Sequence, residues 1–224
     1  EKEVDKRESK VSLWRAYQFA GKLGRRTLKE NIRCELRAQL QKAAQAAGAS
    51  YDLQINSHLY IHMIPFVFEI LLDLGREIPI TFIRLPLEKF FFCWDGISSL
   101  KTYFGPNILK HFLLKTLAER YRSKLNRLGI QSCNYFIGVL FSGRMTEKSI
   151  KAALNKIPVA TDNETVLMIL LHPGGARNGE ELLWNVSDKL FSAYRSEWRI
   201  AERKVLMSPS FRKLTDSALH NIEL

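Results

Sequence analysis

The sequence has few cysteines and no long apolar segment, and these two absences exclude several classes of protein. Its three cysteines show no Cys-x-x-Cys spacing, so neither a disulfide framework nor a zinc knuckle is predicted. The most apolar stretch, residues 63–74, is shorter than the ~18 residues that a membrane span needs, and it contains Glu69 and Asp73. No segment resembles a signal peptide. We therefore expect a cytoplasmic protein without a membrane span, in a compartment that keeps thiols reduced.

Motifs that bind nucleotides or nucleic acids are also missing, although the net charge of the chain is +11. No GxGxxG or Walker A motif follows an apolar run, and no helix-turn-helix, zinc-finger or RNP motif occurs. Much of the positive charge lies in residues 109–129, where basic and apolar residues alternate as on an amphipathic helix. We interpret this segment as a solvent-exposed helix face, with a surface for an acidic partner as the alternative. No nucleic-acid partner is predicted.

The chain is expected to fold as one α/β domain after a short lead-in. Residues 1–10 are charged and poor in apolar residues, which predicts disorder, and residues 11–224 then form a single domain. Apolar periodicity predicts helices over residues 12–47, 65–75, 107–128, 146–156 and 192–207, and strands over residues 51–56, 80–85, 134–141 and 165–171. The aromatic segment 86–105 is ambiguous; its run "FFFCW" could stack on a sugar ring, but packing in the core is favoured.

Strands that alternate with helices indicate a parallel sheet, in either a β/α barrel or a doubly wound arrangement. In both folds the carboxyl ends of the strands lie at one edge, where β/α proteins keep their chemistry. Asn56 and His58 follow the first predicted strand, Arg84 closes the second, and His172 follows the fourth. We therefore expect His58 and His172 to face the same cleft.

Two short motifs suggest where chemistry could occur. In "INSHLYIHMIP", an extended chain would place His58, Tyr60 and His62 on one face, although a histidine bonded to a backbone carbonyl is an equally weighted alternative. In "LHPGG", residues 171–175, a proline and two glycines predict a tight turn that can hold His172 at the rim of a cleft. An ordinary loop that ends a strand is the alternative for this second motif.

Four segments together resemble the YdjC-type carbohydrate deacetylases over roughly residues 30 to 215. "INSHLYIHMIPFVFEILLDLGREIPITFIRLPLE" is similar to the family's Asp-Ser-His-x-His-x-His-x-x-Pro segment, and its "IRLPLE" end resembles the branch called HpnK, associated with hopanoid biosynthesis. "FIGVLFSGRMT" is similar to that branch's Gly-x-x-x-Ser-Gly segment. "LLHPGGA" resembles its His-Pro-Gly turn, and "SEWRIAERKVLMSPSFRKL" its closing helix and Ser-Pro.

The resemblance implies a partial (β/α) barrel of the polysaccharide-deacetylase-like type, with parallel strands and flanking helices. It implies removal of acetyl groups from an N-acetylated sugar or glycolipid-like substrate with a divalent metal, magnesium or zinc. By position, His58 matches a metal-binding histidine of the family and His62 matches the last histidine of its motif, and the resemblance suggests both as metal ligands. His172 falls on the His-Pro turn, where we expect proton transfer or oxyanion stabilisation, and Arg84 could orient a polar group of the substrate.

Several family residues have no counterpart in this sequence. Asn56 stands in place of an aspartate and Tyr60 in place of a histidine, and neither the Ala-Asp-Asp-Phe-Gly strand end nor the Gly-x-His strand end occurs. Glu88 and Asp95 are conceivable substitutes for the missing carboxylates. Since catalytic metal sites typically have about three protein ligands, this chain alone is expected to be a weak or inactive enzyme.

Three interpretations of the missing motifs stay open. The chain could lack the amino-terminal part of the family's enzymes, its site could be completed by another chain, for example in a homo-oligomer, or it could have lost catalysis. The alternative from another functional class is a non-catalytic homologue that binds an anionic partner or acts as a scaffold.

Overall fold

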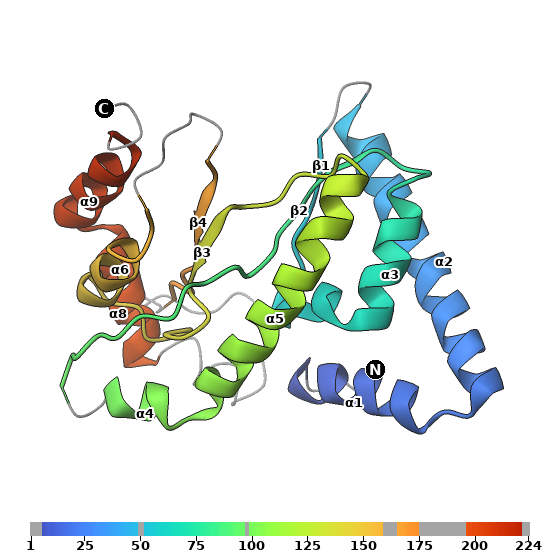
Figure 1. The fold of residues 1–224 in the computed structure, drawn as a ribbon, viewed down its shortest axis with the longest axis horizontal. Coiled ribbons are helices and arrows are strands. Elements are labelled where there is room, and N and C mark those ends of the chain that lie inside the picture. Colours follow the sequence, from blue (N-terminus) through green and yellow to red (C-terminus); the bar gives the residue numbers. More distant parts are fainter. Residues whose placement is uncertain (1–5, 49–51, 97–98, 159–164, 175–195, 221–224) are drawn as a thin grey trace, which may run out of the picture. The chain divides into compact units, whose positions relative to one another are not determined.

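The computed structural model describes residues 6–48, 52–96, 99–158, 165–174 and 196–220. The chain divides into two compact units. Unit 1 comprises residues 1–85 and 117–132, and unit 2 comprises residues 86–116 and 133–224. The 22-residue helix α5 (Pro106–Arg127) contributes its first half to unit 2 and its second half to unit 1. Figure 1 shows the ribbon with its elements labelled.

Unit 1 is built from a small parallel sheet and helices. Its elements are α1 (Lys6–Phe19), α2 (Lys22–Ala47), β1 (Leu53–Ile55), the 3-10 helix η1 (His58–Met63), α3 (Pro65–Leu74), β2 (Ile80–Ile83) and the second half of α5. Strand β1 pairs with β2 in parallel, and Gln131 extends this sheet by a bridge to Phe82. The apolar helix α3 packs against α2, and its Phe68 stacks on Tyr121 of α5 with ring centroids 3.8 Å apart. These contacts hold the β1 carboxyl end, where the predicted histidine motif begins.

Unit 2 contains a second parallel strand pair. Its elements are α4 (Leu100–Tyr103), the first half of α5, β3 (Tyr135–Ile137), α6 (Glu147–Leu154), β4 (Leu167–Ile169), α8 (Glu197–Leu206) and α9 (Pro209–His220). Gly138, directly after β3, has a φ of 132° and approaches β4 so closely that a Cβ would lie 2.6 Å from the carbonyl oxygen of Leu170. Any residue with a Cβ would force the backbone to shift here, which explains why a glycine stands at position 138.

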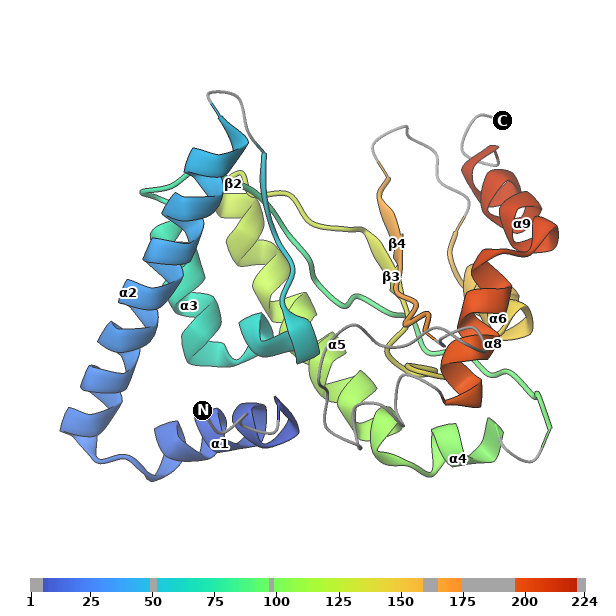
Figure 2. The same ribbon diagram turned by 180° about the vertical axis from the view of Figure 1, so that it is seen from behind.

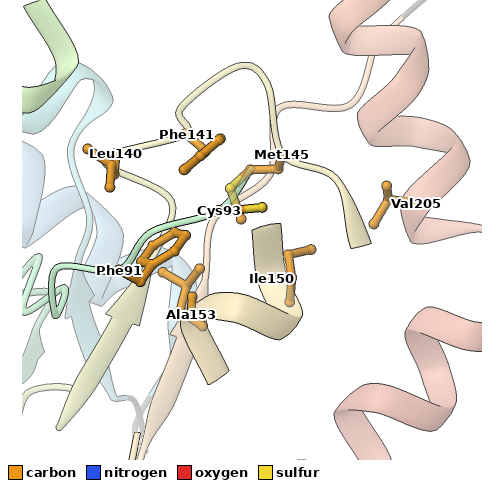
Figure 3. Packing of buried hydrophobic residues seen from close by; sticks show 9 residues of the cluster. Phe91, Cys93, Leu140, Phe141, Met145, Ile150, Ala153 and Val205 are labelled. Carbon is orange, nitrogen blue, oxygen red and sulfur yellow. The ribbon is translucent and has the colours of Figure 1, made fainter. Parts of the chain in front are cut away.

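The core of unit 2 gathers side chains from four separate segments. Figure 3 shows residues of segment 90–94, of the loop after β3, of α6 and of α8 packed together. Phe91 and Cys93 are buried in this core, and the Phe91 ring stacks on Phe141 at 5.4 Å. Phe90, Phe92 and Trp94 are exposed. The aromatic run is thus an extended segment of which alternate residues enter the core, as the period of two requires.

The predicted fold class is confirmed at the level of a mixed α/β protein with parallel strands. The strands are shorter than expected, and hydrogen bonds join them as two pairs, β1 with β2 and β3 with β4. No closed barrel occurs among the described residues, so the architecture is at most a partial barrel. The parallel direction follows from the helices that connect the strands, as the sequence indicated. The expectation of one domain over residues 11–224 stays a prediction.

Helix boundaries differ from the sequence prediction at both ends of the chain. The single helix predicted over residues 12–47 is wrong, because the chain breaks at Gly21, where glycine's low helix propensity separates α1 from α2. Helix α1 also starts at Lys6, inside the predicted lead-in. Helix α9 was not predicted, although Ser208 accepts a hydrogen bond from the Ser210 N–H and Pro209 is its first residue, which is a helix-start pattern.

A helix that crosses a bilayer needs about 20 predominantly apolar residues. Within the described ranges, none of the helices is long and apolar enough to do so.

Candidate functional site

The predicted histidine motif forms a tight 3-10 turn in unit 1. The expectation of an extended chain over this motif is wrong: Leu59 and Tyr60 have positive φ angles of 55° and 59°, which reverse the chain directly after Ser57. The Ser57 hydroxyl stabilises the turn by accepting the His62 backbone N–H at 3.0 Å. As a result His58 is exposed, whereas Tyr60 and His62 are buried, so these three residues do not share one face.

Both ring nitrogens of His62 are engaged in hydrogen bonds. Its Nε2 lies 2.8 Å from the Arg84 carbonyl oxygen, and its Nδ1 lies 2.5 Å from the Ser57 hydroxyl. Because a carbonyl oxygen can only accept, Nε2 carries the proton, and in the neutral ring Nδ1 then accepts from Ser57. A metal ion at His62 would have to displace one of these two partners.

Arg84 is buried at the end of β2 and belongs to the same cluster. One guanidinium nitrogen donates to the Ser57 carbonyl oxygen at 3.2 Å, and the guanidinium carbon lies 5.0 Å from the centre of the Tyr60 ring. The Arg84 side chain therefore stabilises the 3-10 turn by a hydrogen bond to Ser57 and a cation–π contact with Tyr60. Its predicted role in orienting a substrate stays a prediction.

In unit 2, His172 follows β4 in a segment, residues 171–174, that forms neither helix nor strand. Gly175, the last residue of the motif, lies outside the described residues, and the tight turn stays a prediction. The His172 backbone N–H donates to the carboxylate of Glu202 on α8, and its Nδ1 lies 3.9 Å from Glu202 Oε2. The other carboxylate oxygen accepts the Met145 N–H at 3.0 Å. Since Met145 belongs to the "SGRMT" segment, one carboxylate joins three of the motifs on which the family resemblance rests. The His172 side chain is partly exposed, so a rim position is compatible with its surroundings.

Glu202 is the residue of this group that the sequence reasoning missed. The side chain is fully buried, and burial raises the pKa of its carboxyl above the ordinary value, an effect opposed by the hydrogen bonds from Met145 and His172 and by the charge of Arg199. A signal was present in the sequence: Glu202 precedes the buried Val205 by three residues and so lies on the apolar face of the helix. A carboxylate on such a face needs internal donors.

A second buried carboxylate, Glu88, organises the loop after β3. It accepts the backbone N–H groups of Gly138, Val139 and Leu140 at 2.6, 3.1 and 2.7 Å, and the Nδ1 of His111 lies 3.0 Å away. Its oxygen atoms are therefore committed to internal donors rather than open to a substrate.

Asp95, the other conceivable substitute for a family carboxylate, is half exposed. It accepts a hydrogen bond from the Thr146 hydroxyl at 3.1 Å, and the Lys148 ammonium lies 3.8 Å from its second oxygen. Asp95 thus contacts Thr146, the N-cap residue of α6, and its carboxylate remains accessible to solvent.

The described residues do not by themselves fit a divalent metal. Across these ranges, no group of three or more histidine, cysteine, aspartate or glutamate side chains lies close enough together to hold an ion. His58 is exposed in unit 1, His62 is hydrogen-bonded on both nitrogens, and His172 lies in unit 2. The expected meeting of His58 and His172 in one cleft, and the metal-binding roles, stay predictions.

Comparison with known proteins identifies the family. The family model described as YdjC-like protein matches residues 5–217, which is nearly the whole chain. No curated protein and no solved structure matches. The match includes all four segments that carry the resemblance and both carboxylates that tie them together. The chain therefore belongs to the YdjC-like family, a family of carbohydrate-deacetylase-like proteins.

Proposed function

We propose that the chain is a carbohydrate-deacetylase-like protein of the hopanoid-associated branch, which hydrolyses N-acetyl groups of amino sugars when its site is complete. As this chain alone, it should act weakly or not at all. Family membership supports the carbohydrate substrate class. The finer assignment to the branch rests on the "IRLPLE" and "FIGVLFSGRMT" segments.

This proposal rests on which candidate metal ligands are already occupied by internal hydrogen bonds and which are exposed. His62 and Glu88 already have their polar atoms in internal hydrogen bonds, whereas His58 is exposed. One exposed imidazole holds a divalent ion weakly, since catalytic sites typically use about three protein ligands. We therefore propose that magnesium or zinc binds weakly at His58 in this chain alone, and tightly only where further ligands are supplied, by additional residues or by another chain. When bound, such an ion would polarise the amide carbonyl.

His172 is proposed to handle the proton of the leaving amine. Hydrolysis breaks the amide C–N bond, joins the oxygen of water to the acyl carbon and delivers a proton to the nitrogen. An imidazole at a cleft rim can supply that proton. Glu202 would act as a positioning residue, because it holds the His172 backbone and lies near its Nδ1. At 3.9 Å the carboxylate is too far to accept a hydrogen bond from Nδ1, but its charge favours the protonated imidazole that such a step needs.

Acetate release tests the proposal directly. The chain is incubated with a panel of N-acetylated amino sugars and chito-oligosaccharides, with magnesium or zinc, and acetate is measured. We expect binding of at least one sugar by calorimetry and a turnover far below the ~1–10³ per second typical of enzymes. Asn56→Asp restores the carboxylate that the family has at this exposed position, and should strengthen divalent-metal binding roughly tenfold, about 1.4 kcal/mol.

His58→Ala supplies the loss-of-function comparison, with Asn56→Ala as a control at a neighbouring exposed residue. The proposal predicts that His58→Ala weakens zinc binding and that Asn56→Ala does not. Fast acetate release by the unmodified chain would contradict the incomplete site. No binding of any N-acetylated sugar, with zinc affinity unchanged in His58→Ala, would contradict the assigned function itself.

A further inference from the structure

The helical bend of unit 1 carries an uneven distribution of charge. Residues 13–29, the basic bend, span the end of α1 and the first two turns of α2 and contain no aspartate or glutamate. Five cations lie in this stretch, and all of them are exposed: Arg15, Lys22, Arg25, Arg26 and Lys29. Figures 1 and 2 show the two helices meeting at the bend, in dark blue.

Aromatic and hydrogen-bond contacts fix the bend to unit 1. The Tyr17 ring stacks on Phe66 with centroids 4.1 Å apart, and Trp14 stacks on the same ring at 6.4 Å. Across the turn, the Arg25 guanidinium donates to the backbone carbonyls of Tyr17 and Gln18 at 2.9 and 2.7 Å. The angle between the two helices is therefore held by defined contacts. Arg25 is one of them, and the Lys29 ammonium lies 5.6 Å from the centre of the Tyr17 ring.

Two large apolar side chains stand exposed at the corner. Phe19, the last residue of α1, is 86% exposed, and Leu23, in the first turn of α2, is 78% exposed. Single exposed apolar residues are ordinary, but here two lie at one corner, in a stretch whose charged residues are all cations. Phe19 and Leu23, together with the cations of the basic bend, match the surface of an anionic membrane, where lipid phosphates lie outside the apolar acyl chains.

We propose that the basic bend docks on an anionic lipid bilayer, with Phe19 and Leu23 entering the interface and the cations meeting lipid phosphates. Lys and Arg near such a surface are attracted by its negative potential. A nucleic acid offers phosphates as well, but base stacking would use only the Phe19 ring and would leave the exposed Leu23 without a matching contact. This mode of contact involves an interfacial surface and no spanning helix, and it does not depend on the proposed hydrolysis.

Co-sedimentation of the full chain with vesicles tests the proposal. Vesicles of equal parts phosphatidylcholine and phosphatidylglycerol are compared with pure phosphatidylcholine at low and high salt. We expect binding only to the anionic vesicles and a loss of binding in high salt. The triple variant Arg15→Ser, Lys22→Ser, Arg26→Ser should lower the partition coefficient roughly 100-fold, from about fivefold per cation. The double variant Phe19→Ala, Leu23→Ala should lower it about tenfold or more.

The chain offers matched controls. Phe104→Ala with Leu109→Ala removes the same residue types at nearly the same exposures, 87% and 74%. Replacement of Arg120, Arg122 and Arg127 by serine removes three exposed cations elsewhere on the chain. Circular dichroism verifies the fold of every variant. The proposal is overturned if the control variants lose as much binding as the test variants, or if the chain does not bind anionic vesicles. It is also overturned if the chain binds DNA and the Phe19→Ala, Leu23→Ala variant binds DNA equally well. A self-association that the double variant abolishes, without vesicle binding, would also overturn it.

Discussion

Replacement of Glu88 by alanine should destabilise unit 2 strongly. Its carboxylate accepts three consecutive backbone N–H groups, of Gly138, Val139 and Leu140, and the His111 ring lies against it, all of them buried. An unsatisfied buried donor costs about 1–3 kcal/mol, but the loop can relax and such losses are not additive. We expect a loss of about 3–5 kcal/mol in the free energy of unfolding, a large share of the ~5–15 kcal/mol of an ordinary domain.

Urea denaturation followed by circular dichroism measures this loss, provided that the slope with denaturant is unchanged. Glu88→Gln should lie between wild type and Glu88→Ala, because the amide oxygen still accepts but the amide nitrogen faces backbone donors. Glu197→Ala is the matched control: it removes an exposed carboxylate of the same unit and should change stability by less than about 0.5 kcal/mol. If Glu88→Ala costs less than about 1 kcal/mol, the carboxylate does not support the loop and the reasoning fails.

The buried groups of both units support three further predictions. Burial raises the pKa of the Glu202 carboxyl, so the stability that this residue contributes is fully present below the ordinary pKa of 4.5 and is lost as pH rises through the raised pKa. The variant Glu202→Gln should flatten this part of a curve of unfolding free energy against pH. His62→Ala should cost about 2–4 kcal/mol in urea denaturation, whereas His58→Ala at its exposed position should cost less than about 0.5 kcal/mol; equal costs would contradict the buried hydrogen-bonded ring. Burial raises the pKa of the Cys93 thiol, so a thiol reagent followed by mass spectrometry should label the exposed Cys34 first, and faster labelling of Cys93 would refute its burial.

The parallel strand pairs could be predicted from the sequence because their signal is local. Apolar runs separated by helical periodicity indicate crossovers, and crossovers require parallel strands. The aromatic run "FFFCW" illustrates the limit of such patterns. Its composition predicts burial, but only Phe91 and Cys93 are buried, because an extended chain directs alternate side chains to opposite faces.

The geometry of the candidate site was less predictable. Histidines two residues apart are consistent with a strand, and nothing in their spacing reveals that Leu59 and Tyr60 take left-handed conformations, which the Ser57 hydroxyl and neighbouring packing must stabilise. Glu202 is distant in sequence from His172 and Met145, which it joins. These contacts are tertiary, and the only local sign of them in the sequence is the position of Glu202 on the apolar face of a helix.

The division of the chain has a practical consequence. The polypeptide passes between the two units after residues 85, 116 and 132, and one of these passages occurs within the uninterrupted α5. Neither unit is a continuous stretch of sequence, so no single proteolytic cut separates the two units from each other. A break after residue 85 would divide unit 1, a break after residue 132 would divide unit 2, and a break after residue 116 would divide both, so every border between the units cuts through at least one hydrophobic interior.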